Sequence, residues 1–329
     1  MTIQQLVLIG TGPANLRTLL DWCDHPRADT DLTLITPHEC VFHPPMLPGL
    51  LAGHHDVSAC SVPLHDLLAG ARARLMVANV LKIDTEERVL DTMQGAVRYS
   101  TLSIDLPATS QRDAIEAAMP GARANALFTL PLEGLAKLLP QFIQHASSNA
   151  LRVAVIAYDA DCGVSSAELA MALRHRLPHC HVSLLHSGLQ CANSGAESLL
   201  RRILKEHGIT ALQDTCVGIE ADSIRLQSGA SLLCSAAIVH SSGTTAPPWY
   251  ESNRLAAHAP ERPAVQWIDC GNRRAIASFQ AWSVSGRLVW QLKTVRERRQ
   301  FRPYLQAAQN RSAKSASHPE PESNIAEST

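Results

Sequence analysis

The chain contains 329 residues, of which 46% are hydrophobic and 18% charged, and its formal net charge is −1. This length suits about two domains with hydrophobic cores, and the balanced charge argues against nucleic acid or another polyanion as the main partner. No apolar run approaches the roughly 20 residues that span a bilayer, and no signal peptide precedes the first predicted strand. We therefore expect a cytoplasmic protein without a transmembrane segment. Nine scattered cysteines without a Cys-x-x-Cys pair indicate neither a zinc ribbon nor a redox disulfide, and we predict no metal site.

The N-terminal segment predicts a strand, a glycine turn and a helix in direct succession. An apolar run at 6–9 is followed by a turn and then by a helical pattern over 16–22, and the turn consists of Gly10, Thr11, Gly12, Pro13, Ala14 and Asn15. In a dinucleotide-binding βαβ unit the first glycine makes the tight turn, the second lets the backbone approach a pyrophosphate, and the helix directs unpaired N–H groups to the phosphates. Asn15 stands where a third glycine is usual, so we expect the helix and strand to approach each other less closely. The alternative is a structural turn in another kind of α/β domain.

A second strand is predicted at 32–36 and ends at Thr36-Pro37. An acidic residue at this position normally holds a ribose hydroxyl in the dinucleotide fold, whereas Thr36 offers only a hydroxyl. The following segment, 41–49, contains Met46, Leu47 and Pro48 and is too rich in proline for a helix or a central strand, so we predict an ordered loop. Further short strands are predicted at 74–83, 88–91 and 102–105.

The same rhythm returns in the second half of the chain. A strand at 151–157, a turn at 158–163, an amphipathic helix at 165–177 and a strand at 181–186 repeat the βαβ pattern. The predicted fold is α/β with two Rossmann-like dinucleotide-binding units, the second inserted into the first, and no large C-terminal domain. We expect the first unit to comprise 1–125 and 235–305 and the second to comprise 126–234. The polar segment 306–329, which has no periodicity, is expected to form a disordered tail.

Several short motifs carry a family resemblance over residues 5 to about 305. They are Gly10–Leu16, Leu34–Pro37, the Met-Leu-Pro-Gly block that begins at Met46 and ends at Gly53, Tyr99–Asp105, Ile238–Gly243 and Phe301–Tyr304. Together they resemble the two-dinucleotide-fold flavoproteins of the pyridine nucleotide-disulfide oxidoreductase family. Within this family the chain is similar to the type II NADH dehydrogenase-like oxidoreductases, and in particular to the branch of selenide-water-dikinase-associated FAD oxidoreductases.

This resemblance implies that the first unit binds FAD and the second binds NAD(P)H, with electrons passing as hydride to the flavin and then to a quinone or another acceptor. The residues implied in FAD binding are Gly10, Gly12, Pro13, Ala14, Asn15, Thr36 and Pro37, together with Met46, Leu47 and Pro48 against the isoalloxazine ring. Because the cofactor performs the redox chemistry, no side chain is required as a nucleophile or general base, and we name no catalytic residue.

The chain departs from the family at two motifs. Ala157 and Asp159 stand at family glycine positions, where their side chains would obstruct a pyrophosphate, so Gly163 and Glu168 are the remaining NAD(P)H candidates. The family's Gly-Asp, whose carboxylate holds the ribityl chain of the flavin, is best matched by Gly271-Asn272, which lacks the charge. The alternative to an FAD-dependent oxidoreductase is therefore a non-catalytic regulatory or binding protein on a degenerate flavoprotein scaffold.

Two polar clusters have competing interpretations. Metal-type residues lie across a predicted helix end and the next strand, at His175, His179, Cys180 and His181, where a helix C-terminus that favours cationic groups explains them better. A run of arginines on the last helix, Arg296, Arg298, Arg299 and Arg302, indicates a solvated face, and the alternative is attraction to anionic lipid through peripheral membrane contact.

Overall fold

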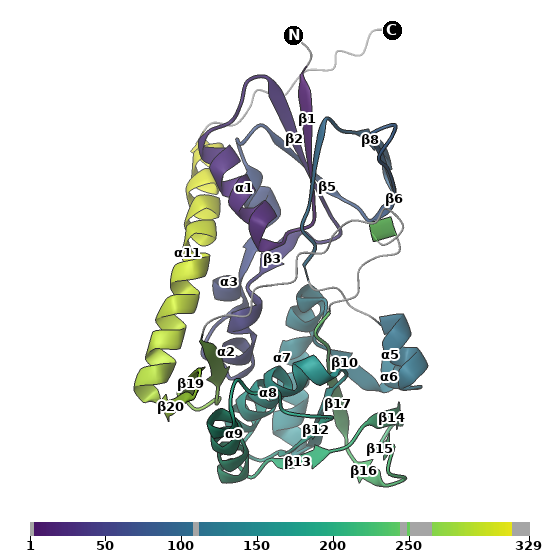
Figure 1. Cartoon of the computed structure of the whole chain (residues 1–329), viewed down its shortest axis with the longest axis vertical. Helices are drawn as coiled ribbons and strands as arrows, with labels where there is room; N and C mark the ends of the chain where they lie inside the picture. The colour runs from purple at the N-terminus through teal and green to yellow at the C-terminus, as the bar shows by residue number, and fades with distance from the viewer. Residues whose placement is uncertain (1–2, 108–111, 244–248, 251–264, 318–329) are drawn as a thin grey trace. The chain divides into compact units, whose positions relative to one another are not determined.

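The computed structural model describes residues 3–107, 112–243, 249–250 and 265–317, with side chains up to residue 313. The chain forms two compact units (Figure 1). Unit 1 consists of 1–41, 61–107 and 301–329, and unit 2 consists of 42–60 and 108–300.

Unit 1 is built on a parallel sheet with the order β5-β2-β1-β9. Its strands are β1 (Gln4–Ile9), β2 (Thr30–Thr36), β5 (Ala73–Val77) and β9 (Thr101–Ile104), and Leu8 of β1 pairs with Leu34 and Ser103. Helices α1 (Pro13–Asp24) and α4 (Leu64–Leu68) contribute Leu19, Leu64 and Leu67 to its core. An antiparallel sheet of β6 (Val80–Asp84), β7 (Val89–Thr92) and β8 (Gly95–Arg98) completes the unit, and β3 (Cys40–Phe42) pairs with β4 (Ser61–Pro63). The predicted strand–turn–helix and second strand are confirmed.

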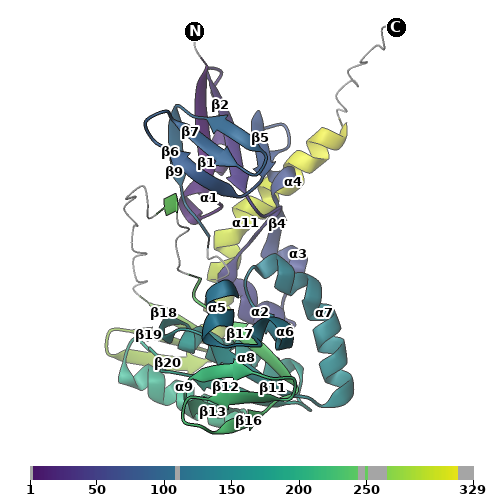
Figure 2. The same cartoon turned by 90° about the vertical axis from the view of Figure 1, so that its right-hand side faces the viewer.

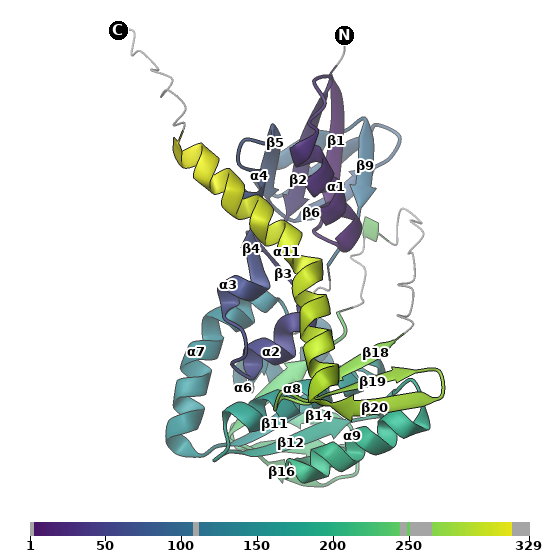
Figure 3. The same ribbon diagram turned by 90° about the vertical axis from the view of Figure 1, so that its left-hand side faces the viewer.

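The last helix, α11 (Arg287–Ser317), corrects one expectation (Figure 3). Residues 306–317, assigned by composition to a disordered tail, continue this helix. Phe301 and Ala308 are buried in the core of unit 1, and Arg311 donates a hydrogen bond to the carbonyl of Leu67 and pairs with Asp24 at 2.9 Å. These contacts hold the C-terminal part of α11 in unit 1.

Unit 2 contains a five-stranded parallel sheet with the order β10-β17-β11-β12-β13. Strands β17, β11, β12 and β13 of this sheet are labelled in Figure 2. Its strands are β10 (Ala126–Phe128), β17 (Ala236–His240), β11 (Arg152–Ala157), β12 (His181–His186) and β13 (Thr210–Gln213). Its longer helices are α7 (Leu132–Asn149), α8 (Gly163–Arg176) and α9 (Ser194–Glu206). Helix α8 is buried along most of its length, because α2 and β18 cover the side that the sheet does not.

The boundary between the units differs from the predicted one. Strand β17 pairs with β11 in the second sheet, so 235–300 belongs to unit 2 rather than to the first unit. The same holds for α5 (Arg112–Ala118) and α6 (Ala122–Asn125). Two antiparallel sheets complete unit 2: β14 (Cys216–Ile219), β15 (Ser223–Leu226) and β16 (Ser231–Leu233), and β18 (Gln266–Asp269), β19 (Ala275–Phe279) and β20 (Trp282–Gly286).

The proline-rich segment is helical, so its prediction as a loop was wrong. From Pro44 on it forms a 3-10 turn, η1 (Pro44–Met46), and the beginning of α2 (Leu47–Leu51). A further short helix, α3 (Val57–Cys60), follows. Pro44 and Pro45 begin η1, and Pro48 lies in the first turn of α2. Proline is tolerated at these positions because the first N–H groups of a helix have no intrahelical partner.

Candidate functional site

The glycine turn of unit 1 is held closed by Asn15. Gly10 has a φ of +84°, and a Cβ at this position would lie 2.5 Å from the carbonyl oxygen of Asp105. The buried Asn15 side chain donates from Nδ2 to the carbonyls of Ile9 and Gly10 at 2.9 and 3.0 Å, and its Oδ1 accepts from the Ser103 hydroxyl at 2.7 Å. Asn15 thus fixes the helix to both flanking strands, and the expected wider separation of helix and strand stays a prediction.

The N-terminus of α1 is occupied by the chain's own carboxylate. Oδ2 of Asp105 accepts hydrogen bonds from the backbone N–H groups of Ala14 at 2.7 Å and Asn15 at 3.3 Å. A Cβ on Gly12 would lie 2.0 Å from Oδ1 of the same carboxylate. Unpaired N–H groups at a helix N-terminus favour an anion, and Asp105 supplies one at the position where the fingerprint directs a phosphate.

The remaining predicted residues of unit 1 lie at the end of β2. Thr36 is buried, and its hydroxyl accepts a hydrogen bond from the backbone N–H of His38 at 3.3 Å. Pro37 is exposed directly after it. A ribose contact by these residues stays a prediction.

The corresponding turn of unit 2 is capped by Asp159. Its Oδ1 accepts from the backbone N–H of Cys162 at 3.0 Å, and its Oδ2 accepts from the N–H and hydroxyl of Ser242 at 2.8 and 2.9 Å. The turn is the 3-10 segment η2 (Ala160–Cys162), and a Cβ on Gly163 would lie 2.0 Å from the carbonyl oxygen of Gly188. Gly163 therefore permits a close backbone crossing, and its contact with NAD(P)H stays a prediction.

Unit 2 contains a cavity of about 460 Å³. Its walls come from η1 and α2, the first half of α8, the end of β17, the beginning of β18 and α11. Its lining includes Leu47, Pro48, Ser165, Glu168, His240 and Lys293. The structure thus brings together three residues predicted separately, Leu47, Pro48 and Glu168, whereas Met46 is buried in the core of unit 2.

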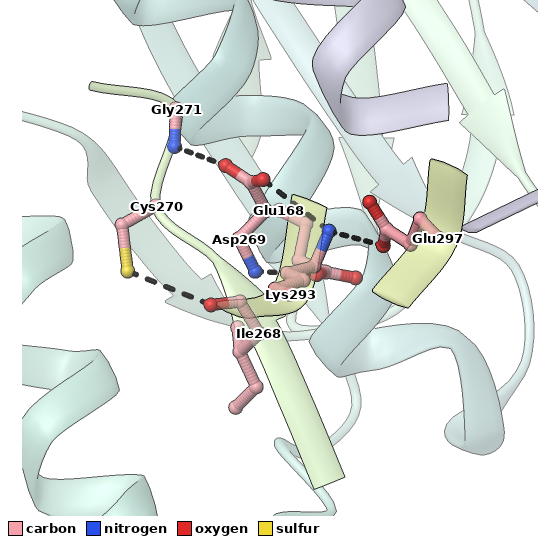
Figure 4. A network of polar contacts seen from close by, with 7 residues as sticks. All are labelled: Glu168, Ile268, Asp269, Cys270, Gly271, Lys293 and Glu297. Atoms are coloured by element: carbon pink, nitrogen blue, oxygen red, sulfur yellow. Dashed lines mark hydrogen bonds and ion pairs between the residues drawn. The ribbon is translucent and has the colours of Figure 1, made fainter. Parts of the chain in front are cut away.

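Figure 4 shows a buried polar network, of which Glu168, Lys293 and Glu297 line this cavity. Nζ of Lys293 lies 3.3 Å from Oδ2 of Asp269 and 2.6 Å from Oε1 of Glu297. Oε1 of Glu168 accepts a hydrogen bond from the backbone N–H of Asp269 at 2.5 Å, and Oδ1 of Asp269 accepts one from the N–H of Gly271 at 2.8 Å. One lysine is therefore surrounded by three acids from α8, β18 and α11.

The network favours a neutral Glu168 beside a charged Lys293. Burial raises the pKa of Glu168 to about 8, although Lys293 opposes this change, so the carboxyl group carries a proton at neutral pH. Burial alone would lower the pKa of Lys293, but Glu168, Asp269 and Glu297 together raise it above its ordinary value. The wall thus presents a protonated carboxyl group next to a permanent cation.

A neutral histidine lies on another side of the cavity. Nε2 of His240 is 2.9 Å from the Ser165 hydroxyl, and Nδ1 is 2.7 Å from the Thr129 hydroxyl. Burial lowers the pKa of His240 to about 4, so the imidazole is uncharged at neutral pH. Both ring nitrogens have hydroxyl partners that can donate or accept.

The predicted pair Gly271-Asn272 lies in the turn between β18 and β19. Gly271 has a φ of +78°, and a Cβ there would lie 2.4 Å from the carbonyl oxygen of Met171 on α8. Asn272 is exposed. The glycine therefore permits close packing of an antiparallel hairpin on α8, and a flavin contact by this pair stays a prediction.

Sequence reasoning missed most of the network. Lys293, Asp269, Glu297 and His240 were not nominated, although Lys293 and Glu297 share an i,i+4 spacing on a helix rich in arginine. The metal-type cluster gives no further site: among the residues that the structure describes, no group of three His, Cys, Asp or Glu side chains could hold a metal ion. Within the same ranges, no helix is both long and apolar enough to cross a bilayer.

No protein-family model and no curated protein matches the chain. Solved structures do. The sulfide:quinone oxidoreductase of Aquifex aeolicus has a TM-score of 0.69 at 16% identity, with 92% of each chain covered. NDH2 from Plasmodium falciparum in complex with NADH has a TM-score of 0.69 at 11% identity, covering 97% of this chain and 99% of that one. A chain of the covalent putidaredoxin reductase–putidaredoxin complex has a TM-score of 0.63 at 15% identity, covering 84% of this chain and 81% of that one. At these identities the likeness establishes the fold, and the predicted α/β architecture with two Rossmann-like units is confirmed.

Proposed function

Because the chain has the two-dinucleotide fold of the type II NADH dehydrogenase-like FAD/NAD(P) oxidoreductases, we propose that it is an FAD-dependent oxidoreductase. NAD(P)H is the proposed electron donor and a quinone-like molecule the proposed acceptor. When bound, FAD supplies the ability to accept a hydride and to pass on its electrons. The protein binds and orients the reactants and controls protons.

Unit 1 contains the residues that would hold the pyrophosphate and the ribose of the cofactor. In unit 1, the N–H groups of Ala14 and Asn15 suit the pyrophosphate once Asp105 has turned away, and Gly12 leaves the space beside them open to a ligand. The end of β2 at Thr36 would face the ribose. In unit 2, Leu47 and Pro48 provide a rigid apolar wall suited to a planar ring.

The observation that carries the proposal is the buried carboxyl group of Glu168, which lies with Lys293 on the wall of a cavity. Reduction of a quinone-like acceptor takes up protons as well as electrons, and a carboxyl group with a pKa of about 8 can hold a proton at neutral pH and release it. Lys293 lines the same cavity, and its positive charge is held by ion pairs with Asp269 and Glu297. The name of one structural neighbour, sulfide:quinone oxidoreductase, supports a quinone as acceptor.

The electron donor has one observation for it and one against it. A neighbouring structure contains NADH, which supports a nicotinamide donor. Asp159 opposes it, because its carboxylate occupies the amide of Cys162 and would repel a pyrophosphate at that turn. Bound FAD that no nicotinamide reduces would favour a different donor or the non-catalytic alternative.

The exposed face of α11 supports peripheral membrane contact for a cytoplasmic protein. Leu288, Leu292 and Val295 recur at i, i+4 and i+7 and are 75%, 63% and 63% exposed. Exposed arginines at 296 and 299 flank this stripe. An apolar stripe bordered by arginines is typical of helices that lie on anionic bilayers, where a lipid-soluble quinone would be found.

The test of the proposed function is direct. Purified protein should be yellow, or become yellow when FAD is added, and should release FAD on denaturation. Colourless protein that takes up no added FAD would contradict the proposal.

A further inference from the structure

We infer that the carboxylate of Asp105 competes with the diphosphate of a bound nucleotide for the N-terminus of α1. The inference rests on the proposed function, because it concerns the same nucleotide site. Its basis is the pair of hydrogen bonds from the N–H groups of Ala14 and Asn15 to Oδ2 of Asp105. Nucleotide binding then requires the Asp105 side chain to leave.

Competition follows from space and from charge. The Asp105 carboxylate lies where a Cβ of Gly12 would point, and the dinucleotide fingerprint keeps this space free of side chains so that a pyrophosphate can approach. The two N–H groups cannot serve a phosphate oxygen while they bind Oδ2. Two anions at one helix N-terminus also repel each other, and such like-charge contacts are costly.

The side chain can leave without unfolding the turn. The backbone of Asp105 is held on both sides, by its N–H to the carbonyl of Ile9 at 2.9 Å and by its carbonyl to the N–H of Gly12 at 2.8 Å. Asn15 independently ties the turn to Ile9, Gly10 and Ser103. The half-buried Asp105 side chain therefore needs only to rotate.

Asp159 in unit 2 differs in this respect. It is part of the turn that it caps, and it connects Cys162 to Ser242 through both carboxylate oxygens. Removing it would disturb the local structure. Asp105 instead directly follows strand β9, outside the turn. Its carboxylate can therefore leave the N–H groups of Ala14 and Asn15 while the turn stays folded.

The test measures binding of FAD and of ADP, which carries the diphosphate without the flavin, by isothermal titration of the full chain. Asp105→Asn removes the charge at nearly constant shape, and Asp105→Ala removes the whole occupant. Both should bind FAD and ADP about tenfold more tightly than the wild type, a typical size for coupling between competing ligands. Asp91→Asn, which removes an exposed aspartate of the same unit, should bind as the wild type does. Adenosine, which has no diphosphate, should not distinguish the proteins.

The outcomes separate the two claims. FAD binding that is no tighter in either Asp105 variant overturns the inference and leaves the proposed function standing. If no protein binds FAD or ADP, both fail. Hydrogen exchange reports the contact itself: the amides of Ala14 and Asn15 should exchange faster in Asp105→Ala while those of β1 stay protected. Unchanged exchange at these two amides would also overturn the inference.

Discussion

Oε1 of Glu168 accepts a hydrogen bond from the backbone N–H of Asp269 at 2.5 Å and thereby joins α8 to β18. The side chain of Asp269 in turn contacts Lys293 on α11. Helix α8, strand β18 and helix α11 are therefore joined by one buried network of charged side chains. Because these contacts lie within the protein itself, stability measurements without a cofactor can test them.

Replacing Lys293 with methionine should destabilise the protein strongly. The change leaves Asp269 and Glu297 buried without their cation, and breaking a buried ion pair in this way costs about 3–5 kcal/mol of the free energy of unfolding. Urea denaturation followed by circular dichroism measures the loss. Arg298→Ala, at an exposed position on the same helix, should change stability by less than about 0.5 kcal/mol. Equal effects of the two changes would contradict the network.

Glu168→Gln should alter the pH dependence of stability. The folded-state pKa of about 8 lies above the ordinary value of 4.5, so between these values the folded protein holds a proton that the unfolded chain has lost. The wild type should therefore lose stability as pH rises through this window, and the glutamine variant should lose less. His240 acts in the opposite direction at the acidic end, because its lowered pKa weakens the fold as pH falls below its ordinary value. Both proteins share His240, so the difference between their melting temperatures isolates Glu168. Parallel curves would show that Glu168 does not carry the proton.

Asn15→Ala should weaken unit 1. The substitution removes the Asn15 partner of the Gly10 carbonyl and of the Ser103 hydroxyl, at a cost of about 1–3 kcal/mol, whereas the Ile9 carbonyl keeps the N–H of Asp105. Thr18→Ala, on an exposed position of the same helix, is the matched control. Chemical denaturation compares the free energies of unfolding of the two variants. If Thr18→Ala lowers it as much as Asn15→Ala does, the hydrogen bonds of Asn15 do not hold the turn closed.

The face of α11 should bind anionic vesicles. The wild type is expected to co-sediment with vesicles that contain phosphatidylserine, and less so at high salt, because the arginines act through screened charges. The double change Leu288→Ser and Leu292→Ser should abolish most of this binding. Leu233→Ser, at a leucine that is 60% exposed on β16, should leave it intact. Vesicle binding that changes neither with the Leu288 and Leu292 substitutions nor with salt concentration would contradict membrane contact through this face.

The sequence predicted those features that depend on local patterns. An apolar run followed by Gly10 and Gly12 specifies strand, turn and helix within a short segment, and the two βαβ units followed from this. The pairing of β17 with β11 could not be predicted, because a short apolar strand carries no mark of its partner. The helical tail was missed for a related reason: Phe301, Ala308 and Arg311 find their contacts in residues far away in the chain.

The candidate site shows the same division. Leu47, Pro48 and Glu168 were nominated through the family resemblance, whereas Lys293 and Asp269 become meaningful only when α8, β18 and α11 meet. Asp105 is a second example. The strand that directly precedes Asp105 was predicted. The contact of Asp105 with the N–H of Ala14 was not, because the two residues are far apart in the sequence and no repeating pattern relates them.

The measurement that tests the account most directly is anaerobic reduction of the FAD-loaded protein by NADH and by NADPH, followed by flavin absorbance. We predict that at least one of them bleaches the bound flavin on the millisecond-to-second scale and that a water-soluble quinone then restores the absorbance. Bound FAD that keeps its absorbance with both nicotinamides, or a protein that holds no FAD to reduce, would contradict an NAD(P)H-dependent flavin oxidoreductase.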